Sequence, residues 1–135
     1  MSNIDIKQLI TSETRLAKAR TEARARVNTW RNEQEQIEIT FEFDGHTWDA
    51  GLASQTRITP LLKLEALPDG FFWTDANNND VPVTLEQLQA IGQAMNLAIV
   101  NQGFLIHEVQ RQMKETIDTL TDVGALDAFV PGWPT

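Results

Sequence analysis

The sequence of 135 residues contains no cysteine. A thiol redox centre, a zinc site with thiolate ligands and a disulfide scaffold are therefore excluded together. Serine is scarce as well, and none of Ser2, Ser12 and Ser54 lies in the glycine-flanked turn that presents a catalytic serine. There is also no glycine-rich loop of the kind that binds phosphate. These absences predict a protein that is not an enzyme and that carries no cofactor.

Long apolar runs are also missing from the sequence. No run approaches the roughly 20 residues that a helix needs to cross a bilayer, so we expect no association with a membrane. The first residues lack the basic and apolar regions of a secretory signal. We therefore expect the chain to be made, and first folded, in the cytosol.

The two histidines do not complete a catalytic or zinc-binding pattern. His107-Glu108 begins like a metalloprotease helix, but Arg111 stands where the second histidine ligand belongs. His46 follows a predicted hairpin turn. The sequence favours structural or surface positions for both histidines, and we predict no catalytic and no metal-binding residues.

One loop partly resembles a calcium site. Residues 75–80 place oxygen ligands at the first, third and fifth positions of a calcium loop, and Glu86 falls at the twelfth. Asp80 occupies the sixth position, where the loop needs glycine, and Pro82 follows it. Asparagine and aspartate also favour turns through side-chain hydrogen bonds to the backbone. The sequence thus favours a turn here, and ion binding is left open.

Charge is distributed unevenly along the chain, whose formal net charge is −8. Residues 1–31 hold seven basic and three acidic residues, which makes this segment +4 and the remainder −12. A basic segment can bind nucleic acid, but Glu13 and Glu22 interrupt it and Trp30 is its only aromatic residue. The charged outer face of a coiled coil accounts for the same residues. Nucleic acid is therefore not the expected partner.

Residues 4–36 predict one long helix, because they are rich in Ala, Arg, Lys, Glu and Gln and lack glycine and proline. Apolar residues recur on it every seven positions, in a stripe too narrow to stabilise an isolated helix. The stripe predicts pairing with another helix, in the same chain or in copies of it. We predict that residues 1–31 are a helical association arm and residues 32–135 a single α+β domain. The predicted interface residues are Leu9, Leu16, Ala23, Val27 and Trp30.

A β-hairpin follows the arm. Residues 37–43 alternate between apolar and polar side chains, which predicts a half-buried strand. Asp44-Gly45 is a two-residue turn that tolerates positive φ, and residues 46–49 form the return strand. The loop length sets the cross-strand pairs as Phe43 with His46 and Phe41 with Trp48.

Residues 52–67 predict a helix with one interruption. Thr59 as N-cap and Pro60 at the first helical position fit the start of a helix. The residues that would then face the core are Leu61, Leu62, Leu64 and Leu67.

A turn at residues 68–70 leads to a second hairpin, with strands at 71–74 and 81–83. Pro82 cannot donate a ladder hydrogen bond and predicts an edge strand. Residues 84–87 have the form of a capping box, and apolar residues then recur at helical spacing for about nine turns. The predicted fold class is α+β: a long N-terminal helix, two β-hairpins forming a small antiparallel sheet, a short middle helix and a long C-terminal helix.

Six short motifs follow one another along the chain. They are VNTWRNEQE at 27–35, FEFDGHTWDA at 41–50, SQTRI at 54–58, WTDANN at 73–78, VPVT at 81–84 and AIGQA at 90–94. In this order the chain resembles a phage-tail domain of unknown function, found in small proteins of tailed phages and prophages encoded near tail-fibre genes. The resemblance covers about residues 20–130. Gly51 and Pro60 depart from the usual pattern, which has an acidic and a small residue at these positions.

The resemblance implies a non-catalytic tail component, structural or chaperone-like, whose partner is a tail-fibre or baseplate protein. It implies a location in the virion tail, or in the host cytoplasm during assembly. Tail fibres are trimeric in this resemblance, which favours a homo-oligomer of three chains. The alternatives are a receptor- or glycan-binding tail module and a small nucleic-acid-binding regulator. Candidate partner-contacting aromatic residues are Trp73, Phe129 and Trp133.

Overall fold

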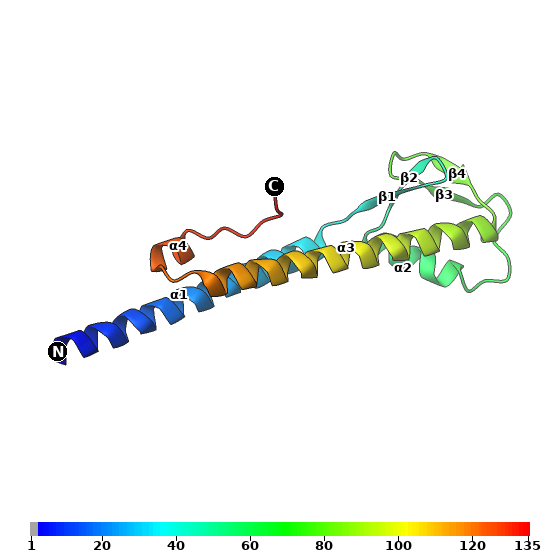
Figure 1. Cartoon of the computed structure of the whole chain (residues 1–135). Coiled ribbons are helices and arrows are strands. Elements are labelled where there is room, and N and C mark those ends of the chain that lie inside the picture. Colours follow the sequence, from blue (N-terminus) through cyan, green and yellow to red (C-terminus); the bar gives the residue numbers. More distant parts are fainter. Residues whose placement is uncertain (1–2) are drawn as a thin grey trace. The chain divides into compact units, whose positions relative to one another are not determined.

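The computed structural model describes residues 3–135, with side chains placed for Ile6 and residues 11–135 (Figure 1). The described chain divides into two compact units. The helical unit consists of the residues up to Glu35 together with Leu105–Thr135, and the hairpin unit consists of Gln36–Phe104. The chain thus divides after Glu35 and after Phe104, whereas the sequence suggested a division after residue 31. The predicted α+β class is confirmed.

The helical unit is built on α1 (Asn3–Gln36), which confirms the helix predicted over residues 4–36. One face of α1 packs against the C-terminal part of α3 (Leu85–Thr119) and against the short helix α4 (Val123–Asp127). The buried residues of this core are Ala19, Ala23, Val27, Trp30, Ile106, Val109, Met113, Ile117 and Leu126.

The helix α4 was not predicted from the sequence, which suggested only a short tail from Asp122 onward. Asp122 is its N-cap, and its Oδ2 accepts a hydrogen bond of 3.2 Å from the backbone N–H of Ala125. This cap starts a single turn that carries Leu126 into the core.

The hairpin unit begins with β1 (Thr40–Phe43) and β2 (His46–Asp49), which pair in the predicted register. Asp44 and Gly45 both have positive φ, as a two-residue hairpin turn requires. Trp48 is only 1% exposed, and its indole Nε1–H donates a 3.1 Å hydrogen bond to the carbonyl oxygen of Phe43. The tryptophan therefore fixes the hairpin that carries it.

The second hairpin pairs β3 (Phe72–Thr74) with β4 (Asp80–Pro82). The prediction of one sheet made from both hairpins is wrong, because each hairpin forms its own two-stranded sheet. Val83 N–H donates to the carbonyl of Phe71, so the backbone of Val83 faces β3. Backbone groups of successive residues point to opposite sides of a strand, so the nitrogen of Pro82 points away from β3, toward the open edge of the sheet. That nitrogen has no hydrogen to offer to a further strand. A backbone hydrogen bond of 2.8 Å, from Ala76 N–H to the Thr47 carbonyl, joins the hairpins.

The middle helix α2 spans Leu52–Leu61, so the predicted extent to residue 67 and the start at Thr59 are wrong. Pro60 lies in the last turn of α2, where it removes one hydrogen bond at the end of the helix. Thr59 does not act as a cap, because its hydroxyl donates back to the Gln55 carbonyl at 2.7 Å. After Leu61 the backbone forms turns with hydrogen bonds between residues three positions apart, from Lys63 N–H to the Pro60 carbonyl and from Leu64 N–H to the Leu61 carbonyl.

Three of the four leucines predicted for the core after Pro60 are partly buried: Leu61, Leu62 and Leu67. Leu64 is exposed, which corrects its assignment to the core, because the helix has ended before this residue. Gly92 of α3 makes room for Leu62, since a Cβ at position 92 would lie 2.7 Å from Leu62 Cδ1.

The helix α3 starts with the predicted capping box. Gln87 N–H donates to Thr84 Oγ1 at 3.1 Å, and Thr84 N–H donates to Gln87 Oε1 at 2.8 Å. The helix continues without a break through Gly103 and contributes to the cores of both units. Within residues 3–135, no helix is long and apolar enough to cross a membrane.

We expect Trp48→Ala to lower the free energy of unfolding by about 3–5 kcal/mol, the usual cost of removing a large buried aromatic side chain. Phe41→Ala should cost less, because Phe41 is only partly buried. The two effects should be less than additive, since the residues are cross-strand partners. Denaturant titrations of both single variants and the double variant measure this, with the exposed Phe72→Ala as control. Additive or near-neutral effects would contradict the packing.

Candidate interaction surfaces

The apolar stripe predicted on the N-terminal helix is covered by the chain itself. Ala23, Val27 and Trp30 are buried in the core of the helical unit, and Leu16 is partly buried against it. The side chain of Leu9 lies outside the described residues. Of the two kinds of pairing that the sequence left open, the structure contains the one within a single chain.

Three arginines of the basic segment hold the C-terminal part of the helical unit. Arg20 Nη2 donates to the Leu120 carbonyl at 2.8 Å, and Arg26 Nη2 donates to the Leu126 carbonyl at 2.7 Å. Leu120 directly follows α3 and Leu126 lies in the last turn of α4, where the helix dipole favours a cation. Arg24 forms an ion pair with Asp118. These contacts explain part of the positive charge without a nucleic acid.

The aromatic residues predicted to meet a partner make contacts within the chain. Trp133 meets Trp30 edge to face with ring centroids 5.1 Å apart, and its Nε1–H donates to Gln34 Oε1 at 3.0 Å. Phe129 packs partly buried against the same core. Trp73 is partly buried in the core of the hairpin unit. All three therefore make contacts within their own unit, although Trp133 is still 40% exposed.

The loop that resembles a calcium site is organised by its first residue. The Asp75 side chain is 2% exposed. Its Oδ1 accepts hydrogen bonds from the N–H groups of Asn79 at 2.8 Å and Asn77 at 2.9 Å, while Oδ2 lies 3.2 Å from His46 Nδ1. Among the described side chains, no group of three or more His, Asp or Glu residues could hold a metal ion. The carboxylate of Asp75 is used to close the turn.

These hydrogen bonds favour the ionised form of Asp75. The backbone N–H of Asn79 is the largest cause of a pKa below the usual 3.8, with His46 and Asn77 acting in the same direction and burial opposing them. A carboxylate that is hydrogen-bonded in the folded state links stability to pH.

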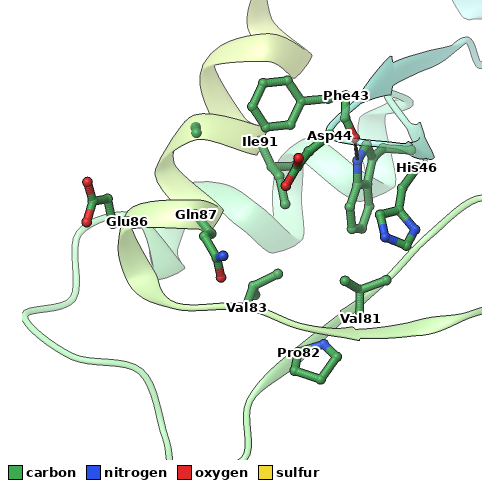
Figure 2. Close-up of a pocket in the computed structure, with 11 residues that line it drawn as sticks. Phe43, Asp44, His46, Val81, Pro82, Val83, Glu86, Gln87 and Ile91 are labelled. Carbon is green, nitrogen blue, oxygen red and sulfur yellow. Dashed lines mark hydrogen bonds between the residues drawn. The ribbon is translucent and has the colours of Figure 1, made fainter.

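A pocket of about 400 Å³ lies between the first hairpin turn, β4 and the start of α3 (Figure 2). Phe43, Val81 and Val83 contribute apolar side chains to its lining. Asp44 and Gln87 contribute polar groups, and the Asp44 carboxylate points toward the pocket in Figure 2. His46 also lines it but is already engaged with Asp75. The sequence did not predict this hollow.

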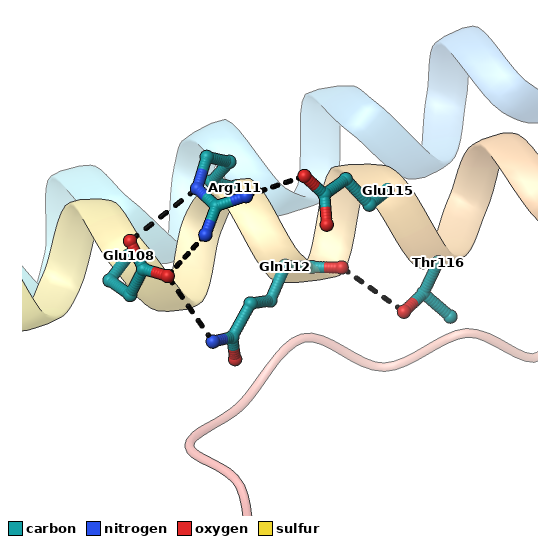
Figure 3. A network of polar contacts seen from close by, with 5 residues as sticks. All are labelled: Glu108, Arg111, Gln112, Glu115 and Thr116. Carbon is teal, nitrogen blue, oxygen red and sulfur yellow. Dashed lines mark hydrogen bonds and ion pairs between the residues drawn. The ribbon is translucent and has the colours of Figure 1, made fainter.

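His107 and its neighbours form a solvated surface. Arg111 forms ion pairs with Glu108 and, at 2.6 Å, with Glu115 (Figure 3). The hydrogen bond from Arg111 lowers the pKa of Glu108, and the same contact raises the pKa of Arg111. His107 Nε2 lies 3.5 Å from Glu35 Oε1 on an exposed side chain. The incomplete zinc motif is thus part of an ion-pair network.

The clearest unpartnered apolar surface lies on α3 in the hairpin unit. Leu97, Val100 and Phe104 are 62%, 66% and 68% exposed. At 3.6 residues per turn they fall within an arc of about 60°. The same geometry places this arc opposite the buried residues Leu88 and Met95. We call these three exposed residues the α3 stripe.

The α3 stripe was not predicted from the sequence, because the helical spacing of apolar residues on this helix indicated a single core face. A signal was present in the spacing. Leu97, Val100 and Phe104 form their own series with steps of three and four, offset from the core series. Exposed apolar residues that cluster in this way mark interaction sites more often than scattered ones do.

Residues 18–130 match a family described as a domain of unknown function, DUF4376. Neither a curated protein nor a solved structure matches the chain.

We expect Asp75→Asn to lower the thermal midpoint at about pH 7, because an amide cannot accept all the hydrogen bonds of the carboxylate. The folded-state pKa lies below the usual 3.8, so this stabilisation is present above that value and is lost as the pH falls through the folded pKa. The difference in thermal midpoint between the wild type and Asp75→Asn should therefore become smaller below about pH 4. Thermal melts across this range measure it, with Asp69→Asn, an exposed carboxylate of the same unit, as a control. A gap independent of pH would contradict the proposed role of the charge.

Proposed function

The chain belongs to the DUF4376 family of domains of unknown function, and we propose that it is a non-catalytic component of a bacteriophage tail. In this proposal it binds a tail-fibre or baseplate protein and serves as a structural or assembly factor in the virion or in the host cytoplasm. The observation that carries the proposal of a binding role is the α3 stripe, with Leu97, Val100 and Phe104 exposed on one face of a packed helix. The assignment to phage tails is supported by the order of the six sequence motifs.

The exposure of the stripe supports a protein partner. A helix in a small domain turns its apolar side chains inward when nothing else covers them. The α3 helix already has such an inward face, with Leu88, Ile91 and Met95 buried. The α3 stripe adds nothing to that core, so its apolar area is available to a partner.

A receptor- or glycan-binding tail module is the second candidate function. Glycan-binding sites commonly display aromatic faces, and the hairpin pocket with Phe43 offers one partly buried ring. The aromatic residues first considered for this role make contacts within their own units: Trp73 is partly buried in a core, and Trp133, still 40% exposed, packs edge to face on Trp30. We therefore favour a partner protein over a glycan. The arginine contacts to the C-terminal carbonyls likewise give a regulator that binds nucleic acid less support.

The trimer expected through residues 1–31 remains a prediction. The apolar stripe on α1 is part of the internal core. Oligomerisation through α1 would therefore use other, exposed residues of this helix, or would require the helical unit to open. Light scattering on the full chain at micromolar concentration measures the number of copies.

We expect the double variant Leu97→Gln/Phe104→Gln to be excluded from assembling tails, because it removes apolar contact area without changing charge. Mass spectrometry of phage particles from a producing host measures the result. If the protein is a structural part, the wild-type chain should be found in the particles. If it is an assembly factor, the fibre proteins should be found in the particles only when the wild-type chain is produced. The variant should reduce that signal by about tenfold or more, the loss that follows from about 1.4 kcal/mol of binding free energy. The variant should keep its thermal midpoint, since both side chains face solvent.

The matched control is Leu52→Gln/Leu64→Gln, which alters two exposed leucines of the same unit that are 77% and 44% exposed. Normal tails with the stripe variant, or equal losses with the control, would overturn the role of the α3 stripe. Particles and fibres that are unaffected by deletion of the whole chain would overturn the tail function itself.

We expect His107→Ala to leave infectivity unchanged, because the imidazole is exposed and contacts only the Glu35 carboxylate among the interactions described. Plaque counts in a complemented deletion measure this. Loss of infectivity with unchanged protein stability would point to chemistry at His107 and against a non-catalytic role.

A further inference from the structure

We infer that the occupant of the α3 stripe is an amphipathic helix of another protein whose apolar face is flanked by lysine or arginine. This inference rests on the proposed function of the stripe as a docking site, and it adds the chemistry of the partner. Three features of the chain carry it: the spacing of the stripe, the charge of the hairpin unit and the engagement of the chain's own basic helix.

The spacing of the stripe fits a helical partner. Leu97, Val100 and Phe104 occupy positions separated by three and four residues, as the seam positions of a coiled coil are. Gln93 and Asn101, which are exposed near this seam, are polar and uncharged. A second helix can lay an apolar face along such a seam without leaving a charge buried and unpaired.

The net charge of the hairpin unit as a whole, rather than any charged residue beside the stripe, favours a partner with basic flanks. Gln36–Phe104 contains nine acidic residues and two basic ones, Arg57 and Lys63, a net charge of −7. All of the acidic residues except Asp75 are exposed. In the part of the chain that the structure describes, none of these exposed carboxylates forms an ion pair with lysine or arginine. Their field attracts a basic segment and repels an acidic one over about a Debye length.

The same charge argues against a second copy of this surface. Two hairpin units that met through the α3 stripe would bring a net −7 against a net −7. Charge complementarity across interfaces suppresses such pairings and favours partners of opposite sign.

The chain's own basic helix is not a suitable occupant either. Its apolar residues Ala23, Val27 and Trp30 are buried in the helical unit. Arg20 and Arg26 are committed to the carbonyls of Leu120 and Leu126. Along the described side chains of this helix, the buried apolar face and these two arginines are already used, which favours a different chain as the partner.

Two synthetic peptides test the inference on the full chain. Both are helical, carry leucine at the seam positions and are labelled with a fluorophore. One has lysine at every flanking position and the other has glutamate. Fluorescence anisotropy should give binding of the lysine peptide at least about tenfold tighter than that of the glutamate peptide, and the difference should shrink as salt is raised.

The variant Leu97→Gln/Phe104→Gln keeps the charge of the hairpin unit and should weaken binding of the lysine peptide by about tenfold or more. The control Leu52→Gln/Leu64→Gln should bind it as the wild type does. Binding that survives the stripe variant would show attraction by charge alone and would overturn the site. Equal affinity for both peptides would overturn the inference that the partner has basic flanks.

Two further outcomes would show that the α3 stripe binds something other than a basic helix. A dimer of the full chain that is lost in the stripe variant would make a second copy the occupant. Binding to vesicles of zwitterionic lipid that depends on the stripe would make it a lipid surface. Failure of the peptides while tail incorporation still depends on the stripe would overturn only the partner chemistry. Failure of incorporation to depend on the stripe would overturn the proposed function, whatever the peptides do.

Discussion

The helical unit depends on the packing of the C-terminal segment onto a helix that cannot stabilise itself. Along its described side chains α1 offers mainly alanines, one valine and one tryptophan to the core, and its other faces are polar. Such a helix has too little apolar area to be stable alone. The last turns of α3, the turn of α4 and the extended C-terminal residues supply the missing apolar surface. Arg20 and Arg26 of α1 stabilise the position of this segment by donating hydrogen bonds to its backbone carbonyl groups.

The helix α3 has a different task along each part of its length. Leu88, Ile91 and Met95 support the hairpin unit, and Ile106, Val109 and Met113 support the helical unit. Between these two sets of core residues lies the α3 stripe, whose side chains serve neither core. A single continuous helix can thus complete two hydrophobic cores and still present one apolar face to another molecule. The proposed docking surface thus lies on a helix whose opposite face is packed in the core of the hairpin unit.

Local signals in the sequence predicted much of the fold. The alternating residues before Asp44-Gly45 fixed the register of the first hairpin, and the capping box at Thr84 fixed the start of α3. Pro60 misled the prediction, because a proline fits the first turn of one helix as well as the last turn of another. Whether the two hairpins share a sheet depends on contacts between segments distant in sequence, which local patterns do not specify. The α3 stripe was missed because exposure depends on the packing of the opposite face. The partner of the α1 stripe lies about a hundred residues away, beyond the reach of local patterns.

The distance in sequence between the arginines of α1 and their acceptors has a consequence for synthesis on the ribosome. Arg20 and Arg26 each bond a carbonyl that lies 100 positions further along the chain. The nascent chain exposes α1 early, and the segment that covers it emerges about a hundred residues later. Contacts of such long range form late and leave the early segment uncovered in the meantime. The sparse apolar content of this segment and its many charged residues disfavour association with other nascent chains during that interval, whereas a stripe of large leucines would promote it.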